Sequence, residues 1–404
     1  MTTPDSAQSE RSDLAWPTWC RRVVFVAPRY PEISGGARYV DNFGRALGDI
    51  GVDVSVISIY PGTSRPKLRT AVAIDREQLH RYPVLRGRRS PGSRVRAIPR
   101  LVYKRWDSLR YRRRLRHMAE SYGADSVFIF THAMAKLTLD ETGFLAERSP
   151  AVFIGQHHSA FESLGQEPGL RDRILRAFSD VDAFTALSEE DASKFAALLN
   201  APCFGVDNIA GPAERFTAGL QERTRTVIAL VRLSHEKQVD VMIRAFATAT
   251  AVPDLQDWRL EIYGDGESRP ELETLIDSLG VGERVRLCGT TDSPARVLGT
   301  ASLNLLTSQY EGFGYSVLEA AQAGTPSIAF DCSPGLRRLM NDVHGYLVDP
   351  EAGEEGYAMR LRELMESPRA LADRGKEAVG GVAAYSASRV LAEWARVLGR
   401  VRIR

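Results

Sequence analysis

The sequence predicts an α/β protein with two domains, each built on a parallel sheet covered by helices. Short apolar runs rich in β-branched residues alternate with longer helical patterns along most of the 404 residues. Glycine-containing turns follow several of these runs, giving the strand, turn, helix order that is typical of parallel sheets. The length is sufficient for two domains of ordinary size, each with its own core.

Composition limits the class of protein further. A hydrophobic content of 44% and a charged content of 26% are those of a soluble globular protein, and no apolar run approaches the ~20 residues that span a bilayer. The four cysteines lack C-x-x-C spacing, which favours free thiols in a reduced, cytoplasmic location over a zinc site. The first residues, through about Leu14, are polar and acidic, and we expect the N-terminus, residues 1–18, to be disordered.

The first domain is predicted to span 19–212. It opens with a strand at 22–27, a turn that contains Gly36, a helix at 37–50 and a strand at 54–59. This is the opening of a Rossmann-like unit, although its turn lacks the G-x-G-x-x-G spacing of dinucleotide-binding proteins. From the sequence alone, this glycine turn can be a plain tight turn.

A basic tract occupies residues 81–116 of this domain. It contains thirteen arginines and one lysine against a single acid, so it carries +13 while the whole chain carries +2 and the remainder −11. Candidate anion-binding residues in it are Arg88, Arg89, Arg94, Arg96, Arg105, Arg112 and Arg113. Such crowded like charges repel one another unless an anion is bound.

Part of the basic tract is predicted to be an amphipathic helix with a basic face. Its apolar residues at helical spacing are Ile98, Leu101, Val102, Trp106 and Leu109. Three interpretations stay open: a solvated helix face, a surface for anionic phospholipid, and a groove for a polyanionic acceptor. Nucleic acid is not expected, because no nucleic-acid-binding motif accompanies the charge.

Histidines follow two further predicted strands. His132 comes after the strand at 124–130, and His157 and His158 come after the strand at 151–155. Open α/β sheets bind ligands at the carboxyl ends of their strands, which favours a functional histidine here. Spacing cannot separate His157 from His158, and none of these histidines has metal-ligand spacing with another.

The second domain is predicted to span 213–384. Its first strand, at 226–231, is followed by Arg232 and Lys237, two cations that could neutralise a diphosphate. Later strands are predicted at 260–263, 284–289, 303–306 and 326–331. Capping arrangements are predicted at Ser188 in the first domain and at Ser268 with Glu271 in the second.

A glycine loop follows the strand at 303–306 and leads into a helix. Free backbone N–H groups and the positive helix end suit a phosphate, and the residues expected there are Gly312, Phe313, Gly314, Tyr315 and Ser316. Glu311 before the helix and Glu319 within it can accept hydrogen bonds from hydroxyls. Together these features suit a sugar nucleotide.

The segment EGFGYSVLEAAQAGTPSIAFDC resembles the donor-site signature of the retaining glycosyltransferases of family 4. The resemblance extends to Gly345–Val348, which is similar to the family's G-x-L-V segment, and to residues 231–237, which are similar to its G-R-L-x-x-x-K loop. The chain departs from the latter at Val231, where the family has glycine. The resemblance implies a GT-B fold, in which a C-terminal helix, here 385–404, crosses back to the first domain.

The resemblance also implies roles for the candidate residues. Glu311 would contact the transferred sugar and Glu319 the ribose of the donor. Arg232 and Lys237 would bind the diphosphate, His158 would reach the donor sugar, and Gly36 would face the donor phosphates. The implied activity is that of a hexosyltransferase that uses a nucleotide sugar, with UDP favoured, and that retains the anomeric configuration.

Within the family, the same segment is most similar to poly(polyol-phosphate) α-glucosyltransferases and envelope polysaccharide transferases. With the basic tract, this favours an anionic acceptor such as a teichoic acid or a lipid-linked glycan, and peripheral contact with the inner face of the cytoplasmic membrane. No cofactor or metal is expected, since the Asp-x-Asp at 180–182 enters a strand instead of leaving one. Two alternatives are a non-catalytic binding protein with this fold and a GT-B phosphorylase or epimerase.

Overall fold

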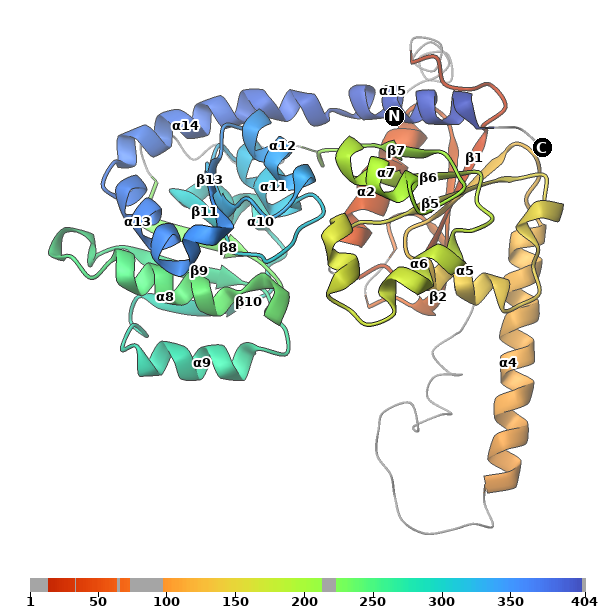
Figure 1. Ribbon diagram of the computed structural model, residues 1–404, viewed down its shortest axis with the longest axis horizontal. Coiled ribbons are helices and arrows are strands. Elements are labelled where there is room, and N and C mark those ends of the chain that lie inside the picture. Colours follow the sequence, from red (N-terminus) through yellow and green to blue (C-terminus); the bar gives the residue numbers. More distant parts are fainter. Residues whose placement is uncertain (1–13, 33, 64–65, 73–96, 213–222, 402–404) are drawn as a thin grey trace. The chain divides into compact units, whose positions relative to one another are not determined.

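The computed structural model describes residues 14–32, 34–63, 66–72, 97–212 and 223–401, with only the backbone for 97–108. The chain divides into two compact units. Unit 1 comprises Met1–His158, Leu164–Val206 and Ala387–Arg404, and unit 2 comprises Ser159–Ser163 and Asp207–Ser386. Each unit is a parallel sheet with helices packed against it (Figure 1).

Unit 1 contains a seven-stranded parallel sheet in the order β3-β2-β1-β4-β5-β6-β7. The strands are β1 (Arg22–Tyr30), β2 (Asp53–Pro61), β3 (Arg69–Val72), β4 (Ser126–Phe130), β5 (Val152–Gln156), β6 (Ala183–Ala186) and β7 (Cys203–Gly205). Strands β3 and β7 were not predicted, because both are short edge strands without a clear apolar pattern. The other strands confirm the predicted parallel α/β sheet.

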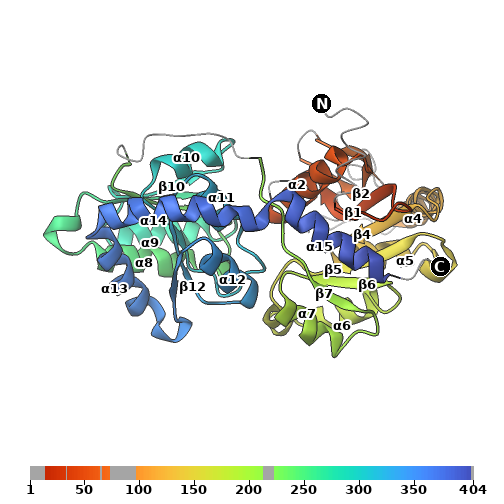
Figure 2. The same ribbon diagram turned by 90° about the horizontal axis from the view of Figure 1, so that it is seen from above.

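The helices of unit 1 connect its strands in the parallel sense, except for α15, which follows the last helix of unit 2 in the chain. They are α2 (Gly35–Asp49), α4 (Ala97–Glu120), α5 (Ala133–Asp140), α6 (Leu170–Ala177), α7 (Glu189–Ala196) and α15 (Ala387–Arg400). The predicted cap at Ser188 is confirmed, since its Oγ accepts a hydrogen bond from the Asp191 backbone N–H at 3.0 Å. Helix α15 packs on α2, where the Trp394 ring stacks on Phe43 with centroids 4.9 Å apart (Figure 2).

The basic tract is only partly within the described residues. Helix α4 confirms the predicted helix, and its last turns are anchored by the buried Leu115 and Ala119. Leu109 was predicted to lie on the apolar face, but it is 50% exposed, so the apolar stripe does not continue to this position. Arg112 forms a 3.3 Å ion pair with Glu141, and Arg113 is exposed. The others lie outside the described residues, namely Arg88, Arg89, Arg94, Arg96 and the side chain of Arg105.

The expected disorder of residues 1–18 is wrong for its last part. Residues 14–18 form turns in which Trp16 is buried, and its Nε1 donates a hydrogen bond to the Cys20 carbonyl at 3.2 Å. Burial of the Trp16 ring and the hydrogen bond from its Nε1 hold this segment in place, although most of the neighbouring residues are polar. Residues 1–13 lie outside the described residues.

Unit 2 contains a six-stranded parallel sheet in the order β10-β9-β8-β11-β12-β13. The strands are β8 (Thr226–Leu230), β9 (Arg259–Tyr263), β10 (Val285–Gly289), β11 (Leu303–Leu306), β12 (Ser327–Phe330) and β13 (Tyr346–Val348). The helices are α8 (Val239–Ala249), α9 (Arg269–Ser278), α10 (Pro294–Thr300), α11 (Tyr315–Gln322), α12 (Pro334–Asp342), α13 (Gly353–Met365) and α14 (Pro368–Gly381).

The core of unit 2 lies on both faces of this sheet. Val227 of β8 belongs to a large cluster with residues of α8 and α13, whereas Ile228 belongs to a cluster with residues of α10 and α11. Successive side chains of a strand point to opposite faces, so the apolar run of β8 serves both clusters. The predicted capping box at Ser268 is wrong, because the Ser268 side chain makes no cap hydrogen bond.

The two units meet in sequence at Val206 and Asp207, before the predicted boundary at 212/213. Asp207 is 3% exposed and pairs with Arg338 of α12. The Ala210 backbone N–H donates to the Tyr385 carbonyl at 2.9 Å. These contacts place residues from Asp207 onward in unit 2, although their polar composition resembles that of a linker.

Candidate active site

The strand order of unit 2 places two loops at a topological switch point. Strand β8 neighbours both β9 and β11, and chain order runs outward from it in both directions. In open α/β sheets, ligands bind outside the carboxyl ends of the strands at such a point. The loop 231–238 after β8 and the loop 307–314 after β11 both begin there. These two loops carry most of the residues predicted to bind a donor.

An ion pair joins the two loops at their predicted functional residues. Lys237 Nζ lies 2.6 Å from Glu311 Oε1, and the Ser308 hydroxyl donates to the same oxygen at 2.8 Å. The Lys237 and Glu311 side chains are 19% and 17% exposed, so the pair is largely shielded from water while remaining accessible. A carboxylate that accepts hydrogen bonds from a cation and a hydroxyl is held in a fixed direction.

Hydrogen bonds to the backbone hold the two loops in register. The Gln309 N–H donates to the Glu236 carbonyl at 2.9 Å. The Thr307 hydroxyl lies 3.1 Å from the Lys237 carbonyl and 2.8 Å from the Gln238 carbonyl. The loops therefore form one connected structure, and Lys237 and Glu311 do not depend on each other alone for their positions.

Arg232 lies on the same loop as Lys237 but is more exposed. Its Nη2 lies 2.6 Å from Glu236 Oε1, and its side chain is 66% exposed. The Ser234 hydroxyl donates to the same Glu236 oxygen at 2.6 Å. Burial opposes ionisation of Glu236, but the hydrogen bonds from Ser234 and Arg232 hold its pKa below the usual value. Glu236 thus orients a cation that can reach a ligand from solvent, a role that the sequence analysis did not predict.

The glycine loop leads into α11 through Gly314. This residue has φ +90°, and a Cβ placed on it would lie 2.8 Å from a methyl group of Leu336, so glycine is required there. The N–H groups of Val317 and Leu318 donate to the Gly314 carbonyl at 2.9 and 3.3 Å, so a phosphate at this helix end would meet N–H groups that precede them. Of the predicted loop residues, Gly312 is buried, Tyr315 and Ser316 are half-buried, and Glu319 lies in the second turn of α11.

The Phe313 side chain is buried against other aromatic rings and is not placed to contact a ligand. It is 3% exposed, and its ring lies 5.5 Å from that of Tyr315 and 5.4 Å from that of Tyr385, centroid to centroid. Its packing anchors the glycine loop on unit 2. A donor contact at Phe313 would therefore come from its backbone.

Two glycines to which the sequence analysis gave no role pack closely against the backbone of the Arg232 loop. A Cβ on Gly264 would lie 1.7 Å from the Val231 carbonyl oxygen, and one on Gly266 would lie 2.2 Å from that of Leu233. Gly264 also has φ +150°, a conformation essentially confined to glycine. The Gly-Asp-Gly sequence after β9 could have indicated a close approach between two backbone segments. The sequence alone does not show which segment approaches these glycines.

In unit 1 the three candidate histidines have different surroundings. His132 caps α5, because its Nδ1 accepts a hydrogen bond from the Met134 N–H at 3.0 Å. His157 packs edge-on against Phe195, with ring centroids 5.6 Å apart. His158 lies against Tyr39 in α2, with centroids 4.5 Å apart, and its Nε2 is 3.2 Å from Gln156 Oε1. Burial, with smaller contributions from the other two histidines, lowers the pKa of His158 to about 3, so its imidazole is neutral at neutral pH.

Gly36 lies in the same part of unit 1, one turn before Tyr39 on α2. The helix is capped by Ser34, whose Oγ accepts from the Ala37 N–H at 3.2 Å. A Cβ on Gly36 would meet only the Ser34 Oγ, at 3.8 Å, so packing within unit 1 does not require glycine here. The structure thus brings Gly36 and His158 to one edge of unit 1, and Arg232, Lys237, Glu311 and the glycine loop to one edge of unit 2.

The Asp-x-Asp at 180–182 lies at the opposite edge of the unit 1 sheet. Asp180 pairs with the fully buried Lys136 at 2.7 Å, and Asp182 accepts a hydrogen bond from the Phe153 N–H at 2.8 Å. These contacts account for both acids. Within the described part of the chain, no group of three His, Cys, Asp or Glu side chains is arranged to hold a metal, and no helix is long and apolar enough to cross a membrane.

Comparison with solved structures identifies the fold. A variant of Staphylococcus aureus TarM, crystallised with fondaparinux, α-GlcNAc-glycerol and UDP, matches with a TM-score of 0.72 at 13% identity. The match covers 93% of this chain and 99% of that one. At this level of identity the likeness concerns the fold alone, and it confirms the predicted GT-B fold.

Residues 212–379 match the family model for glycosyl transferases group 1. An exopolysaccharide phosphotransferase of Streptomyces coelicolor is 29% identical over 61% of this chain, which corresponds to 26% of that protein. A poly(glycerol-phosphate) alpha-glucosyltransferase of Bacillus subtilis is 24% identical over 65% of this chain, or 40% of that protein. The chain therefore spans less than half the length of either relative.

Proposed function

We propose that the protein is a retaining glycosyltransferase that moves a hexose from a nucleotide sugar, with UDP favoured, to a hydroxyl of an anionic envelope acceptor. The observation that carries this proposal is the Lys237–Glu311 pair at the switch point of a sheet that lies within the match to the glycosyl transferases group 1 model. The pair places a cation for phosphate beside a carboxylate for sugar hydroxyls, and a nucleotide sugar presents both groups close together.

The leaving diphosphate would be stabilised by three features of unit 2. Lys237 and Arg232 supply positive charge, and the N–H groups at the start of α11 supply hydrogen bonds. Negative charge develops on the diphosphate as the glycosidic bond breaks, so donors fixed in advance lower the barrier. We propose that these groups serve in place of a metal ion, and the protein is then expected to need no cofactor.

The sugar and the ribose would be held by the two glutamates. Glu311 Oε1 already accepts from Lys237 and Ser308, which leaves its second oxygen to accept from a hydroxyl of the transferred sugar. Glu319 would accept from the ribose hydroxyls. His158 would contribute a neutral imidazole at the reacting face of the sugar.

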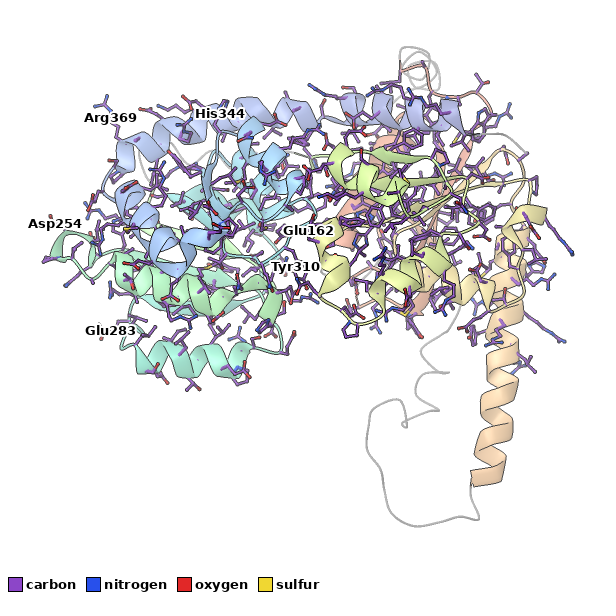
Figure 3. All side chains as sticks on the ribbon, viewed as in Figure 1. Glu162, Asp254, Glu283, Tyr310, His344 and Arg369 are labelled. Carbon is purple, nitrogen blue, oxygen red and sulfur yellow. The ribbon has the colours of Figure 1, made fainter. Side chains whose placement is uncertain are left out.

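The experiment that tests this proposal measures nucleoside-diphosphate release from UDP-, GDP- and ADP-sugars. We expect release from one donor, with and without EDTA, and we expect Glu311→Gln to reduce it by about 10²-fold. Glu283→Gln is the matched control, since Glu283 is exposed on the loop before β10, away from Tyr310 of the glycine loop (Figure 3). Release that needs inorganic phosphate would indicate a phosphorylase, and no release with acceptors present would indicate a binding protein.

The acceptor proposal rests on charge. Arg110, Arg113 and Arg114 are exposed on the described part of α4, in a segment that carries +13 over 81–116. The Bacillus subtilis relative is named for a glycerol-phosphate polymer. We propose that the basic tract binds either such a polyol-phosphate acceptor or the anionic membrane that carries a lipid-linked one.

Sedimentation with vesicles separates these two uses of the basic tract. If the tract docks on membrane, the protein is expected to sediment with vesicles that contain anionic lipid at low salt and to be released at high salt. Zwitterionic vesicles are the control. If instead it holds a polymer, soluble polyol-phosphate is expected to raise the rate of nucleoside-diphosphate release without any vesicle present.

A further inference from the structure

We propose that Gln156 is a positioning residue that fixes the ring and the tautomer of His158, with the hydrogen on Nε2 and Nδ1 left as an acceptor for a substrate hydroxyl. The identity of the hydroxyl rests on the proposed glycosyltransferase function. The tautomer does not, because every group that determines it belongs to unit 1. Neither the sequence motifs nor the family resemblance assigned a role to Gln156.

In the structure, the nitrogen of the Gln156 amide faces two hydroxyls and its oxygen faces His158. Gln156 is the last residue of β5 and is 5% exposed. Its Nε2 donates to the Tyr39 hydroxyl at 2.8 Å and to the Thr185 hydroxyl at 3.0 Å, so both amide hydrogens are used. The amide oxygen then faces His158 Nε2 at 3.2 Å and can only accept.

The acceptor at Gln156 sets the tautomer of the imidazole. A neutral imidazole carries one N–H, and a carbonyl oxygen beside Nε2 places that hydrogen on Nε2. His158 is held neutral because burial lowers its pKa, with His157 and His132 as the neighbouring titratable groups. Nδ1 is then an unprotonated nitrogen at the carboxyl edge of the sheet, and it can accept a hydrogen bond but cannot donate one.

The His158 ring is also held in place by packing. Its centroid lies 4.5 Å from that of Tyr39, whose own ring contacts Phe25 at 5.9 Å and Phe43 at 5.6 Å. Tyr39 thus both supports the ring of His158 and accepts from the amide that orients it. Strand β5, strand β6 and helix α2 each contribute one polar group, and the Gln156 amide joins the three through its hydrogen bonds.

This network is more polar than the fold requires. The preceding residues of β5, from Val152 to Gly155, are buried and apolar or small, and Thr185 is the register partner of Gln156 in β6. A buried amide gives up its hydrogen bonds to water, and an apolar residue at this position would serve the sheet without that loss. Buried polar groups that depart from the pattern around them occur most often at functional sites.

Nitrogen-15 NMR of histidine-labelled protein tests the tautomer directly. The signals of His158 are assigned by their loss in His158→Phe, and the pattern of couplings to the ring protons shows which nitrogen carries hydrogen. We expect the hydrogen on Nε2 in the wild type and a mixture of tautomers in Gln156→Leu. A hydrogen on Nδ1 in the wild type overturns the proposal, and this outcome needs no variant to fold.

Kinetics test whether the tautomer matters to the reaction. Gln156→Leu is expected to lower kcat about tenfold, which is the change one hydrogen bond of ordinary strength supplies, with KM for the donor nearly unchanged. Ser126→Ala removes a buried hydroxyl at the amino end of β4 and is expected to leave kcat unchanged. If Gln156→Leu mixes the tautomers but keeps its kcat, the proposed role of Gln156 is wrong.

The two proposals fail in different ways. A wild type that releases no nucleoside diphosphate from any donor contradicts the glycosyltransferase proposal, whatever the NMR shows. A wild type that turns over donor but carries the His158 hydrogen on Nδ1 contradicts only the role of Gln156. The wild-type spectrum and the donor panel together therefore decide both.

Discussion

Lys237→Ala is expected to lower kcat for nucleotide-sugar turnover by about 10²–10³-fold, the loss typical of removing one group that stabilises transition-state charge. Lys237 Nζ lies 2.6 Å from Glu311, and both side chains are less than one-fifth exposed. The substitution removes one of the two cations proposed to bind the diphosphate. It also leaves the Glu311 carboxylate without its charged partner, and that carboxylate would repel the leaving group.

The double variant Lys237→Ala/Glu311→Gln separates these two effects. Neutralising Glu311 removes the uncompensated carboxylate, so thermal stability is expected to recover relative to Lys237→Ala. Turnover is expected to stay low, because the cation for the diphosphate is still missing. Recovery of turnover in the double variant would show instead that Lys237 serves only to neutralise Glu311. Lys194→Ala is the control, since Lys194 also pairs with a glutamate, Glu190 on α7, but in a more exposed place away from the candidate site.

The sequence predicted where the candidate residues lie better than it predicted their hydrogen-bond partners, and their roles stay predictions. Arg232, Lys237 and Glu311 each follow the carboxyl end of a strand, and the strand order brings the loops that carry them together. Local pattern was sufficient because strands β8 and β11 are apolar runs with clear ends. The bond between the Glu236 carbonyl and the Gln309 N–H joins residues far apart in sequence, and no local pattern signals such a contact.

The features that the sequence analysis predicted wrongly or missed have one physical cause. In each case, contacts with residues from elsewhere in the fold outweighed the local sequence pattern. Ser268 has the sequence of a capping box, yet its backbone is already helical (φ −80°, ψ −1°) and its side chain does not cap. Trp16 lies in a polar segment but is buried. Gln156 was given no role in the sequence analysis, because its partners Tyr39 and Thr185 come from other elements.

Gly264→Ala is expected to destabilise unit 2 by about 3 kcal/mol, the combined effect of backbone strain and overpacking. The new Cβ would lie 1.7 Å from the Val231 carbonyl oxygen, and φ +150° disfavours any side chain. The Val231 N–H also donates to the Tyr263 carbonyl at 2.9 Å, so β8 and β9 would have to separate where the Arg232 loop begins.

Gly280→Ala is the matched control for this change. Gly280 has φ +65°, but nothing lies within 4 Å of its Cβ position, so only backbone strain of about 1 kcal/mol is expected. Amide hydrogen exchange in β8 and β9 measures the difference, and it should be faster in Gly264→Ala alone. Because the displaced loop carries Arg232, KM for the donor should also rise. Equal exchange in the two variants would show that the Arg232 loop does not depend on this close approach.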